Sequence, residues 1–100
     1  MDESRITREG IRIHAREDFA RMHKAGRVAA QILDEVGPLV EPGVSTGALD
    51  DFIRRRVGEL QATSATIGYR GYQHASCISV NHVVCHGIPG EKLLQDGDIL

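Results

Sequence analysis

Several kinds of residue are scarce in this sequence, and each scarcity excludes a class of protein. Tryptophan is absent, and the 100 residues include only two tyrosines, two phenylalanines, three prolines and two cysteines. Two cysteines are too few for a disulfide scaffold, so we expect Cys77 and Cys85 to be free thiols. The sequence has no apolar run of about 18 residues and no apolar signal-peptide core near Met1, so we expect neither membrane insertion nor export. The cytoplasm is the default location.

The sequence also lacks a large excess of positive or negative charge. The chain has 12 basic and 14 acidic residues and a formal net charge of -2. Because mixed charge of this kind neutralises phosphates poorly, nucleic acid is a poor candidate partner. The contents of 41% hydrophobic and 26% charged residues are ordinary for a globular protein, and the length allows one domain at most.

The sequence predicts a long first helix from about Arg16. Apolar or small residues recur there at alternating spacings of three and four, which is typical of a buried helical stripe. The stripe consists of Phe19, Met22, Gly26, Ala29, Leu33 and Val36. Gly37-Pro38 ends the helix, since proline lacks an N–H and disfavours helical geometry at the preceding residue. Residues 1–15 show no clear period and are expected to be irregular.

A second helix is predicted after Ser45, which suits the N-cap position. Val44 and Leu49 stand where the two members of a hydrophobic staple belong. The face expected to be buried comprises Leu49, Phe52, Ile53, Val57 and Leu60. The face expected to be solvated comprises Asp50, Asp51, Arg54, Arg55 and Glu59.

The last third of the chain contains a predicted tight hairpin. Asn81 and His82 suit the centre of a primed two-residue turn, which would place Cys77 opposite His86. Side chains alternate across a strand, so the hairpin has two faces. The mixed face, suited to the wall of a small pocket, comprises Cys77, Ser79, Val84 and His86. The apolar face, expected to pack beneath the helices, comprises Ile78, Val80, Val83 and Cys85. Two helices followed by strands predict an α+β fold, with the helices on one face of an antiparallel sheet.

The residues of this last third allow both structural and functional interpretations. Taken alone, His86 is more often a hydrogen-bonded structural histidine, and Tyr69 and Tyr72 are common core rings. Cys77 is better explained by packing than by nucleophilic chemistry, although a neighbouring His86 could serve as its base. Asp96-Gly97-Asp98 is typical of a turn, and two carboxylates without further ligands make a poor metal site.

Several motifs resemble the type I methionine aminopeptidases. They include Gly68-Tyr69-Arg70-Gly71-Tyr72, Cys77-Ile78-Ser79-Val80-Asn81, Val83-Val84-Cys85-His86-Gly87-Ile88-Pro89, and Asp96-Gly97-Asp98-Ile99. Ala25-Gly26-Arg27 and Pro42-Gly43-Val44-Ser45-Thr46-Gly47 match the family's two opening helices. The resemblance covers Glu17 to Leu100. The chain differs from the family's usual residues at Thr66, Gln73, His74 and His82, which lie around the expected pocket.

The resemblance implies the N-terminal half of a pita-bread fold, with residues 16–100 as the first half of a single aminopeptidase domain. It implies removal of the initiator methionine from nascent proteins, at the ribosome, by a monomeric hydrolase with two divalent ions. Those ions belong to the cobalt, manganese, iron or zinc class. The family's metal ligands would all follow Leu100, so the chain is expected to be truncated, to hold no divalent metal and to be inactive alone.

The same resemblance assigns roles to individual residues. His86 is the expected catalytic residue, which shares a hydrogen bond with the scissile amide while metal-bound hydroxide attacks. The expected methionine pocket comprises Thr66, Tyr69, Tyr72, Cys77 and His86. Asn81 and the carbonyl of Val83 are expected to help hold a monovalent cation.

Three alternatives stay open beside this interpretation. One is a pita-bread protein that has lost catalysis and binds partners or peptides. Another is a cysteine hydrolase that uses Cys77 and His86. The third is a fragment with no independent function.

Overall fold

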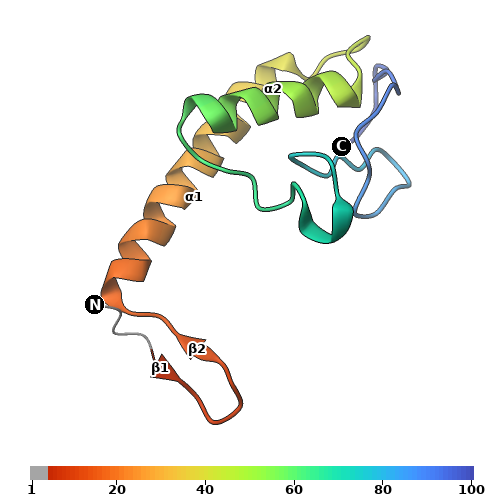
Figure 1. Cartoon of the computed structure of the whole chain (residues 1–100). Coiled ribbons are helices and arrows are strands. Elements are labelled where there is room, and N and C mark those ends of the chain that lie inside the picture. Colours follow the sequence, from red (N-terminus) through yellow and green to blue (C-terminus); the bar gives the residue numbers. More distant parts are fainter. Residues whose placement is uncertain (1–4) are drawn as a thin grey trace.

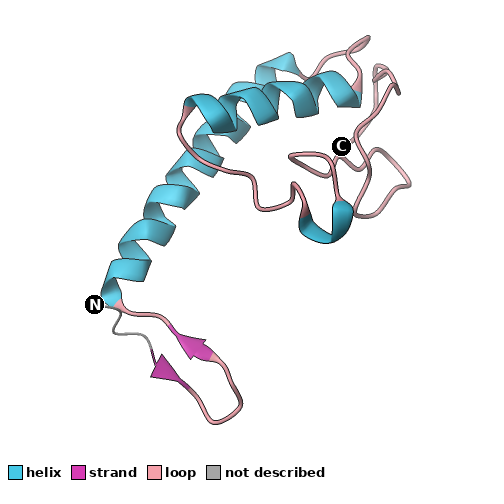
Figure 2. Cartoon of the chain, viewed as in Figure 1, coloured by secondary structure: helices cyan, strands magenta, loops and turns pink. Residues whose placement is uncertain are grey.

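The computed structural model describes residues 5–100, which form a hairpin, two helices and a loop-rich region (Figure 1). The elements are β1 (Arg5–Ile6), β2 (Arg12–Ile13), α1 (Arg16–Val36), the 3-10 turn η1 (Gly37–Leu39), α2 (Thr46–Glu59) and the 3-10 turn η2 (Tyr69–Gly71). Figure 2 shows that the chain after α2 is mostly loop. Both predicted helices are present, and α1 ends at Val36 as Gly37-Pro38 predicts.

Residues 1–15 were expected to be irregular, but residues 5–13 form a β-hairpin, and residues 1–4 lie outside the described part of the chain. β1 and β2 pair antiparallel, with Ile6 opposite Arg12. Between them, Thr7 N–H donates to the Ile11 carbonyl at 2.8 Å, and the Thr7 carbonyl accepts from Gly10 N–H at 3.0 Å. Gly10 has φ 83°, the left-handed conformation that three-residue hairpin loops use at their last position. The signal for this hairpin lies in its turn, because each strand is only two residues long.

α1 is capped by its own first turn. The Asp18 carboxylate accepts a hydrogen bond from Ala15 N–H at 2.9 Å. This contact satisfies a donor at the helix entrance, and it places negative charge near the positive end of the helix dipole. The local signals at both ends of α1 therefore agree with its observed bounds.

The buried face of α1 is not the predicted stripe. Ile32 and Val36 are buried, whereas Phe19, Met22 and Leu33 are 63%, 70% and 69% exposed. The prediction is wrong over most of the helix because α2 lies beside only the C-terminal part of α1 (Figure 1). The apolar face bearing Phe19, Met22 and Leu33 has no cover among residues 5–100.

α2 begins as the sequence predicts. The Ser45 hydroxyl accepts a hydrogen bond from Ala48 N–H at 3.0 Å, which makes Ser45 the N-cap. Leu49 is buried in the core, and Val44 packs against the same core cluster. The predicted apolar face of α2 is buried or half-buried along its length. Asp50, however, is only 2% exposed, and its assignment to the solvated face is wrong.

An ion pair joins the two helices. Arg56 donates two hydrogen bonds to the Glu35 carboxylate, at 2.6 and 2.9 Å. Gln31 donates a third to the same carboxylate at 3.0 Å. The bonds from Arg56, and then that from Gln31, lower the pKa of Glu35 from about 4.5 to about 2. The Arg56 pKa is raised in turn, chiefly by its bond to Glu35.

The core is small and lies where the helices meet the C-terminal segments. Its buried members are Val36, Leu49, Val80 and Leu94. The backbone of Leu94 donates to the Val44 carbonyl and accepts from Gly43 N–H, both at 2.8 Å. Residues far apart in the sequence are thereby held beside the start of α2.

The hairpin predicted between Cys77 and His86 is only partly correct. Val83 N–H donates to the Val80 carbonyl at 3.1 Å, so a turn does form over Asn81 and His82. Ile78 N–H, however, donates to Gly87 at 2.8 Å, whereas the predicted register pairs Ile78 with Cys85. The returning arm thus contains two residues more than predicted, and no strand ladder forms there.

This change of register also corrects the predicted faces of the hairpin. Val80 is buried and Ile78 packs against the core, but Val83 and Cys85 are exposed. His86 has φ 55°, a left-handed conformation that breaks the alternation of an extended strand. Both cysteines are free, as predicted.

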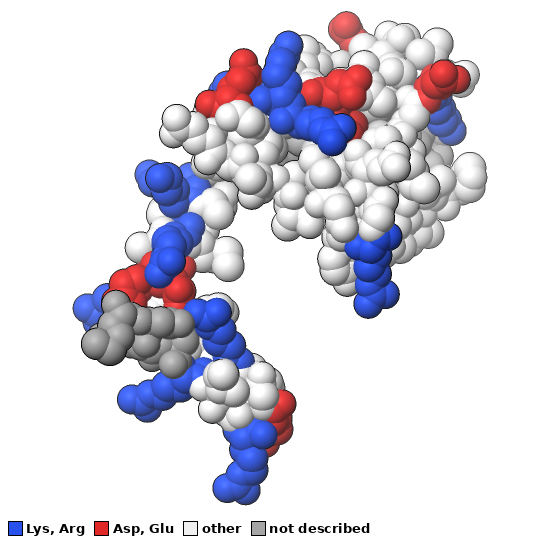
Figure 3. All heavy atoms as spheres, viewed as in Figure 1, with Lys and Arg blue, Asp and Glu red and all other residues white. Residues whose placement is uncertain are grey.

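The molecule is elongated, with extents of 50 × 28 × 23 Å. The β1–β2 hairpin lies at the end of α1 far from α2 (Figure 1). Residues 5–27 carry seven basic and three acidic side chains, and Figure 3 shows Lys and Arg side chains along this projecting part. The expectation of evenly mixed charge, which came from the composition, is therefore wrong for residues 5–27. Within residues 5–100, no helix is long and apolar enough to span a membrane.

Candidate functional site

A cavity of about 630 Å³ lies between the loop after α2 and the segment that bears His86. All five residues of the predicted methionine pocket line it, namely Thr66, Tyr69, Tyr72, Cys77 and His86. Sequence reasoning did not anticipate the other lining residues, which are Ala65, Arg70, Gly71 and Ile88. The structure therefore gathers the candidate residues in one place, and their roles stay predictions.

The tyrosines are presented by a tight glycine-bounded loop. Gly68 and Gly71 have φ angles of 86° and 80°, which glycine adopts without steric cost. Gly68 N–H donates to the Tyr72 carbonyl at 2.7 Å, and Tyr72 N–H donates to the Tyr69 carbonyl at 2.9 Å. The Arg70 guanidinium lies 5.4 Å from the centre of the Tyr69 ring, within cation–π range. The glycines of the motif thus allow the turn that brings both rings to the cavity.

The Tyr72 hydroxyl is held as a neutral donor. It donates to the Ser76 carbonyl at 2.7 Å. Burial, followed by its interaction with Cys77, raises the pKa of Tyr72 to about 12. Near neutral pH the phenol therefore keeps its proton, and the cavity wall beside it carries no charge from this residue.

Asp50 anchors the cavity wall to α2. Its carboxylate accepts hydrogen bonds from the Ser76 hydroxyl at 2.6 Å and from Ala75 N–H at 3.3 Å. His74 Nδ1 lies 3.4 Å from the same carboxylate. Such a buried carboxylate is stable only when hydrogen-bonded, and here its partners directly precede Cys77. No sequence signal separated Asp50 from the exposed Asp51 beside it.

Two hydroxyl groups also hold residues 74–75 of this wall in place. Thr66 donates to the His74 carbonyl at 2.7 Å, and Ser64 donates to the Ala75 carbonyl at 3.1 Å. The hydroxyls of Ser64 and Thr66 are themselves 2.9 Å apart. Thr66 is thus both a lining residue and a support for the segment that leads to Cys77.

The predicted monovalent-cation residues lie on the turn that precedes His86. The Asn81 amide donates to Asp98 at 2.9 Å and accepts from Ile99 N–H at 3.0 Å. The Asn81 side chain therefore tethers the end of the chain, and its amide oxygen already has a protein partner. Cation binding by Asn81 and the Val83 carbonyl stays a prediction.

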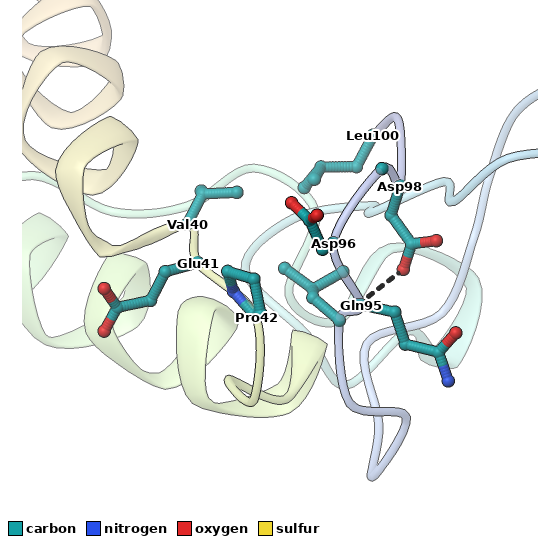
Figure 4. A pocket seen from close by; sticks show the side chains of 9 residues that line it. Val40, Glu41, Pro42, Gln95, Asp96, Asp98 and Leu100 are labelled. Atoms are coloured by element: carbon teal, nitrogen blue, oxygen red, sulfur yellow. Dashed lines mark hydrogen bonds between the residues drawn. The ribbon is translucent and has the colours of Figure 1, made fainter.

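A second, smaller cavity of about 170 Å³ lies between residues 40–42 and 94–100 (Figure 4). The Glu41 side chain points away from Asp96 and Asp98. Asp98 accepts from Gln95 N–H at 2.8 Å, and this bond closes the predicted turn. The bond from Asn81, followed by that from Gln95, lowers the Asp98 pKa. Across residues 5–100, no group of three His, Cys, Asp or Glu side chains could hold a metal ion.

Taken together, the larger cavity offers an aromatic and largely apolar wall, a neutral phenol and an imidazole. Such a site can take an apolar side chain and present a hydrogen-bonding group to the atoms next to it.

Residues 20–100 match metallopeptidase family M24. The methionine aminopeptidase of Escherichia coli K12 is 53% identical over 95 residues, covering 90% of this chain and 35% of that protein. The methionine aminopeptidase of Rickettsia prowazekii is 42% identical over 90 residues, with the same coverage. The crystal structure of the Rickettsia enzyme aligns with a TM-score of 0.83 over 86% of this chain and 35% of its own. The Thermotoga maritima methionine aminopeptidase aligns at 0.84, with 35% identity over 88% of this chain and 36% of its own.

The fold shared with these solved structures is the pita-bread α+β fold, which confirms the fold class predicted from the sequence. The chain belongs to metallopeptidase family M24, and its resemblance to the methionine aminopeptidases is confirmed. It spans about 35% of the length of the curated relatives that it matches.

Proposed function

We propose that the complete protein removes the initiator methionine from nascent proteins. The observation that carries this proposal is the single cavity that gathers Tyr69, Tyr72, Cys77 and His86. The cavity volume of about 630 Å³ falls within the usual range of roughly 300–1,000 Å³ for small-ligand sites. Similarity to relatives that are named methionine aminopeptidases supports the same choice of substrate.

The cavity wall suits a methionine side chain. Each methylene that leaves water contributes about 0.8 kcal/mol to binding. A thioether also makes favourable contacts with aromatic rings, and Tyr69 and Tyr72 provide two rings at this wall. Charged side chains would gain less from such a wall, so we expect selectivity for an apolar first residue.

His86 is the candidate catalytic residue of this cavity. In our proposal its imidazole donates a hydrogen bond to the scissile peptide group of the bound substrate. A preorganised donor lowers the barrier when it stabilises charge that develops in the transition state. Tyr69 and Cys77 shape the wall and determine which side chain is accepted.

Family M24 is a metallopeptidase family, and divalent ions in such enzymes supply an activated water. Residues 5–100 do not fit this requirement, since no three potential ligands among them converge. We propose that two divalent ions, of the cobalt, manganese, iron or zinc class, are bound by residues that follow Leu100 in the complete protein.

The setting of the reaction belongs to the same proposal. The substrates are N-terminal methionine peptides of nascent proteins, encountered in the cytoplasm at the ribosome. The complete protein acts as a monomer.

The kinetic test compares the complete protein with its His86→Ala variant on a Met-Ala peptide. We expect turnover to fall about a hundredfold or more, because one preorganised donor is lost, while metal content measured by mass spectrometry is retained. His23→Ala is the control, because His23 is an exposed histidine on α1 and does not line the cavity. Unchanged turnover in His86→Ala would return this residue to a structural role.

Three further measurements separate the alternatives. Cys77→Ala should alter side-chain preference but retain hydrolysis, whereas loss of all hydrolysis would favour a cysteine hydrolase. The 100-residue chain alone should release no methionine from a peptide. In a calorimetric titration with manganese, it should not bind two ions. Peptide binding by the complete protein without hydrolysis would favour the non-catalytic alternative.

A further inference from the structure

His86 has a backbone conformation that an L-amino acid rarely adopts. Its φ of 55° lies in the left-handed region, which is costly for a residue with a Cβ atom. Such a conformation persists only when the surrounding structure determines it, and such strain is often found at functional sites. The contacts that hold the backbone next to His86 therefore determine where its imidazole lies.

The following residue, Gly87, is held on both sides by residues 78–79. Its N–H donates to the Ser79 hydroxyl at 3.0 Å, and its carbonyl accepts from Ile78 N–H at 2.8 Å. A Cβ atom at Gly87 would lie 2.1 Å from the Ile78 carbonyl oxygen, so only glycine allows this approach. The close contact between Gly87 and residues 78–79 leaves Gly87 buried, while His86 stays exposed at the cavity.

A second clamp acts three residues further on. The buried Thr46 hydroxyl accepts from Gly90 N–H at 2.9 Å, and Gly47 N–H donates to the Gly90 carbonyl at 2.7 Å. Pro89, which is buried, has a fixed φ and further stiffens the link. Residues 87–90 are thus tied at one end to residues 78–79 and at the other to the start of α2.

We propose that Ser79 is a positioning residue for His86 and acts through the Gly87 amide. Ser79 does not line the cavity, so it does not itself contact a substrate there. Its hydroxyl is the only side-chain group in this clamp on Gly87, since the other partner is backbone. The kinetic consequence rests on the proposed function, whereas the effect on the conformation of His86 does not.

The test uses Ser79→Ala and Ser79→Thr in the complete protein. Ser79→Ala removes the acceptor of Gly87 N–H, whereas Ser79→Thr keeps a hydroxyl. With a Met-Ala peptide, Ser79→Ala should lower kcat between tenfold and a hundredfold, the scale expected for a misplaced catalytic group. KM should change by less than about twofold, because Tyr69, Tyr72 and Cys77, which form the rest of the wall, are unaltered. Ser79→Thr should recover most of the lost kcat.

The matched control is Thr7→Ala in the distant β1–β2 hairpin. Thr7 is also half-buried, and its hydroxyl accepts one backbone N–H, that of Ile11, at 3.1 Å. This variant loses a comparable hydrogen bond without touching residues 78–90. We expect its kcat to equal that of the unaltered protein.

A second readout does not depend on hydrolysis. In Ser79→Ala, hydrogen exchange at Gly87 N–H should accelerate, and the imidazole NMR signals of His86 should shift or broaden. His86→Ala identifies those signals by their disappearance. If the unaltered protein proves inactive, changed His86 signals still support positioning by Ser79, and the proposed function alone fails.

Unchanged Gly87 exchange and unchanged His86 signals in Ser79→Ala would overturn the proposal, whatever the kinetics. If the unaltered protein is active, a kcat of Ser79→Ala equal to that of the Thr7→Ala control would also overturn it. If Ser79→Ala does not fold, the nearly isosteric Ser79→Cys decides by the same readouts, since its thiol is a weak acceptor.

Discussion

At the scale of single residues, the cavity is supported by polar groups that do not line it. Asp50 supports the segment before Cys77 by accepting from Ala75 N–H and the Ser76 hydroxyl. Tyr72 is tied to the same segment through the Ser76 carbonyl. The positions of the residues that line the cavity therefore depend on this buried hydrogen-bond network.

Replacement of Asp50 should be strongly destabilising. Asp50→Ala leaves at least two donors without their acceptor in a buried place, which we expect to cost roughly 2–4 kcal/mol of unfolding free energy. Urea denaturation should show a lower midpoint with little change in slope. Asp51→Ala is the matched control, because this neighbouring carboxylate is exposed and should change stability by about 0.5 kcal/mol or less. Equal midpoints for the two variants would contradict this account.

The sequence could predict the lining of the cavity better than its support. Tyr69, Tyr72 and His86 stand in short motifs that resemble a known family, so they could be named without coordinates. Asp50 could not, because a carboxylate on an amphipathic helix looks like a solvated charge until a distant segment donates to it. The role of the Ser79 hydroxyl could not be predicted either, because its partner Gly87 becomes a neighbour only in the observed register.

At the scale of elements, helix ends were predictable, whereas the buried face of α1 was not. Ser45 and Pro38 act within a few residues of their own position, so sequence is sufficient to place the start of α2 and the end of α1. Which face of α1 is buried depends on where α2 lies, and this is a tertiary property. The predicted hairpin register was wrong for a comparable reason, because the pairing of Ile78 with Gly87 and the left-handed conformation of His86 are set by the tertiary structure.

The ion pair between α1 and α2 should make stability depend on pH. The Glu35 pKa is lowered from about 4.5 to about 2, mainly by Arg56. A lowered pKa means that the pair contributes its full stability above about pH 4.5 and loses it as the pH falls towards 2. The difference in unfolding free energy between the native chain and Glu35→Gln should shrink across this window.

Asp34→Asn is the control for this measurement. Asp34 is an exposed neighbour of Glu35 on the same helix. The Asp34→Asn variant keeps the pair between Glu35 and Arg56, so its stability should still fall as the pH drops from about 4.5 towards 2. A constant difference between the native chain and Glu35→Gln across the window would show that the pair does not form in solution.

At the scale of the whole molecule, the chain is more extended than its length requires. The radius of gyration is 16.7 Å, compared with about 13 Å expected for a compact domain of 100 residues. The excess comes from the hairpin and the first half of α1, which lie away from the core (Figure 1). Phe19 and Met22 are exposed on this projecting part.

This exposed apolar face should make the 100-residue chain associate with itself. Contiguous apolar surface of this kind gains free energy when it leaves water, and a second copy supplies a matching face. Sedimentation velocity should show a weight-average mass that rises with concentration. Phe19→Glu, Met22→Glu or Leu33→Glu should shift the distribution towards monomer, since burial of the introduced carboxylate is costly. Ala20→Glu adds the same charge to another side of the same helix, so it should leave association nearly unchanged. If the native chain stays monomeric at every concentration, or if Ala20→Glu is as effective as Phe19→Glu, association does not run through this face of α1.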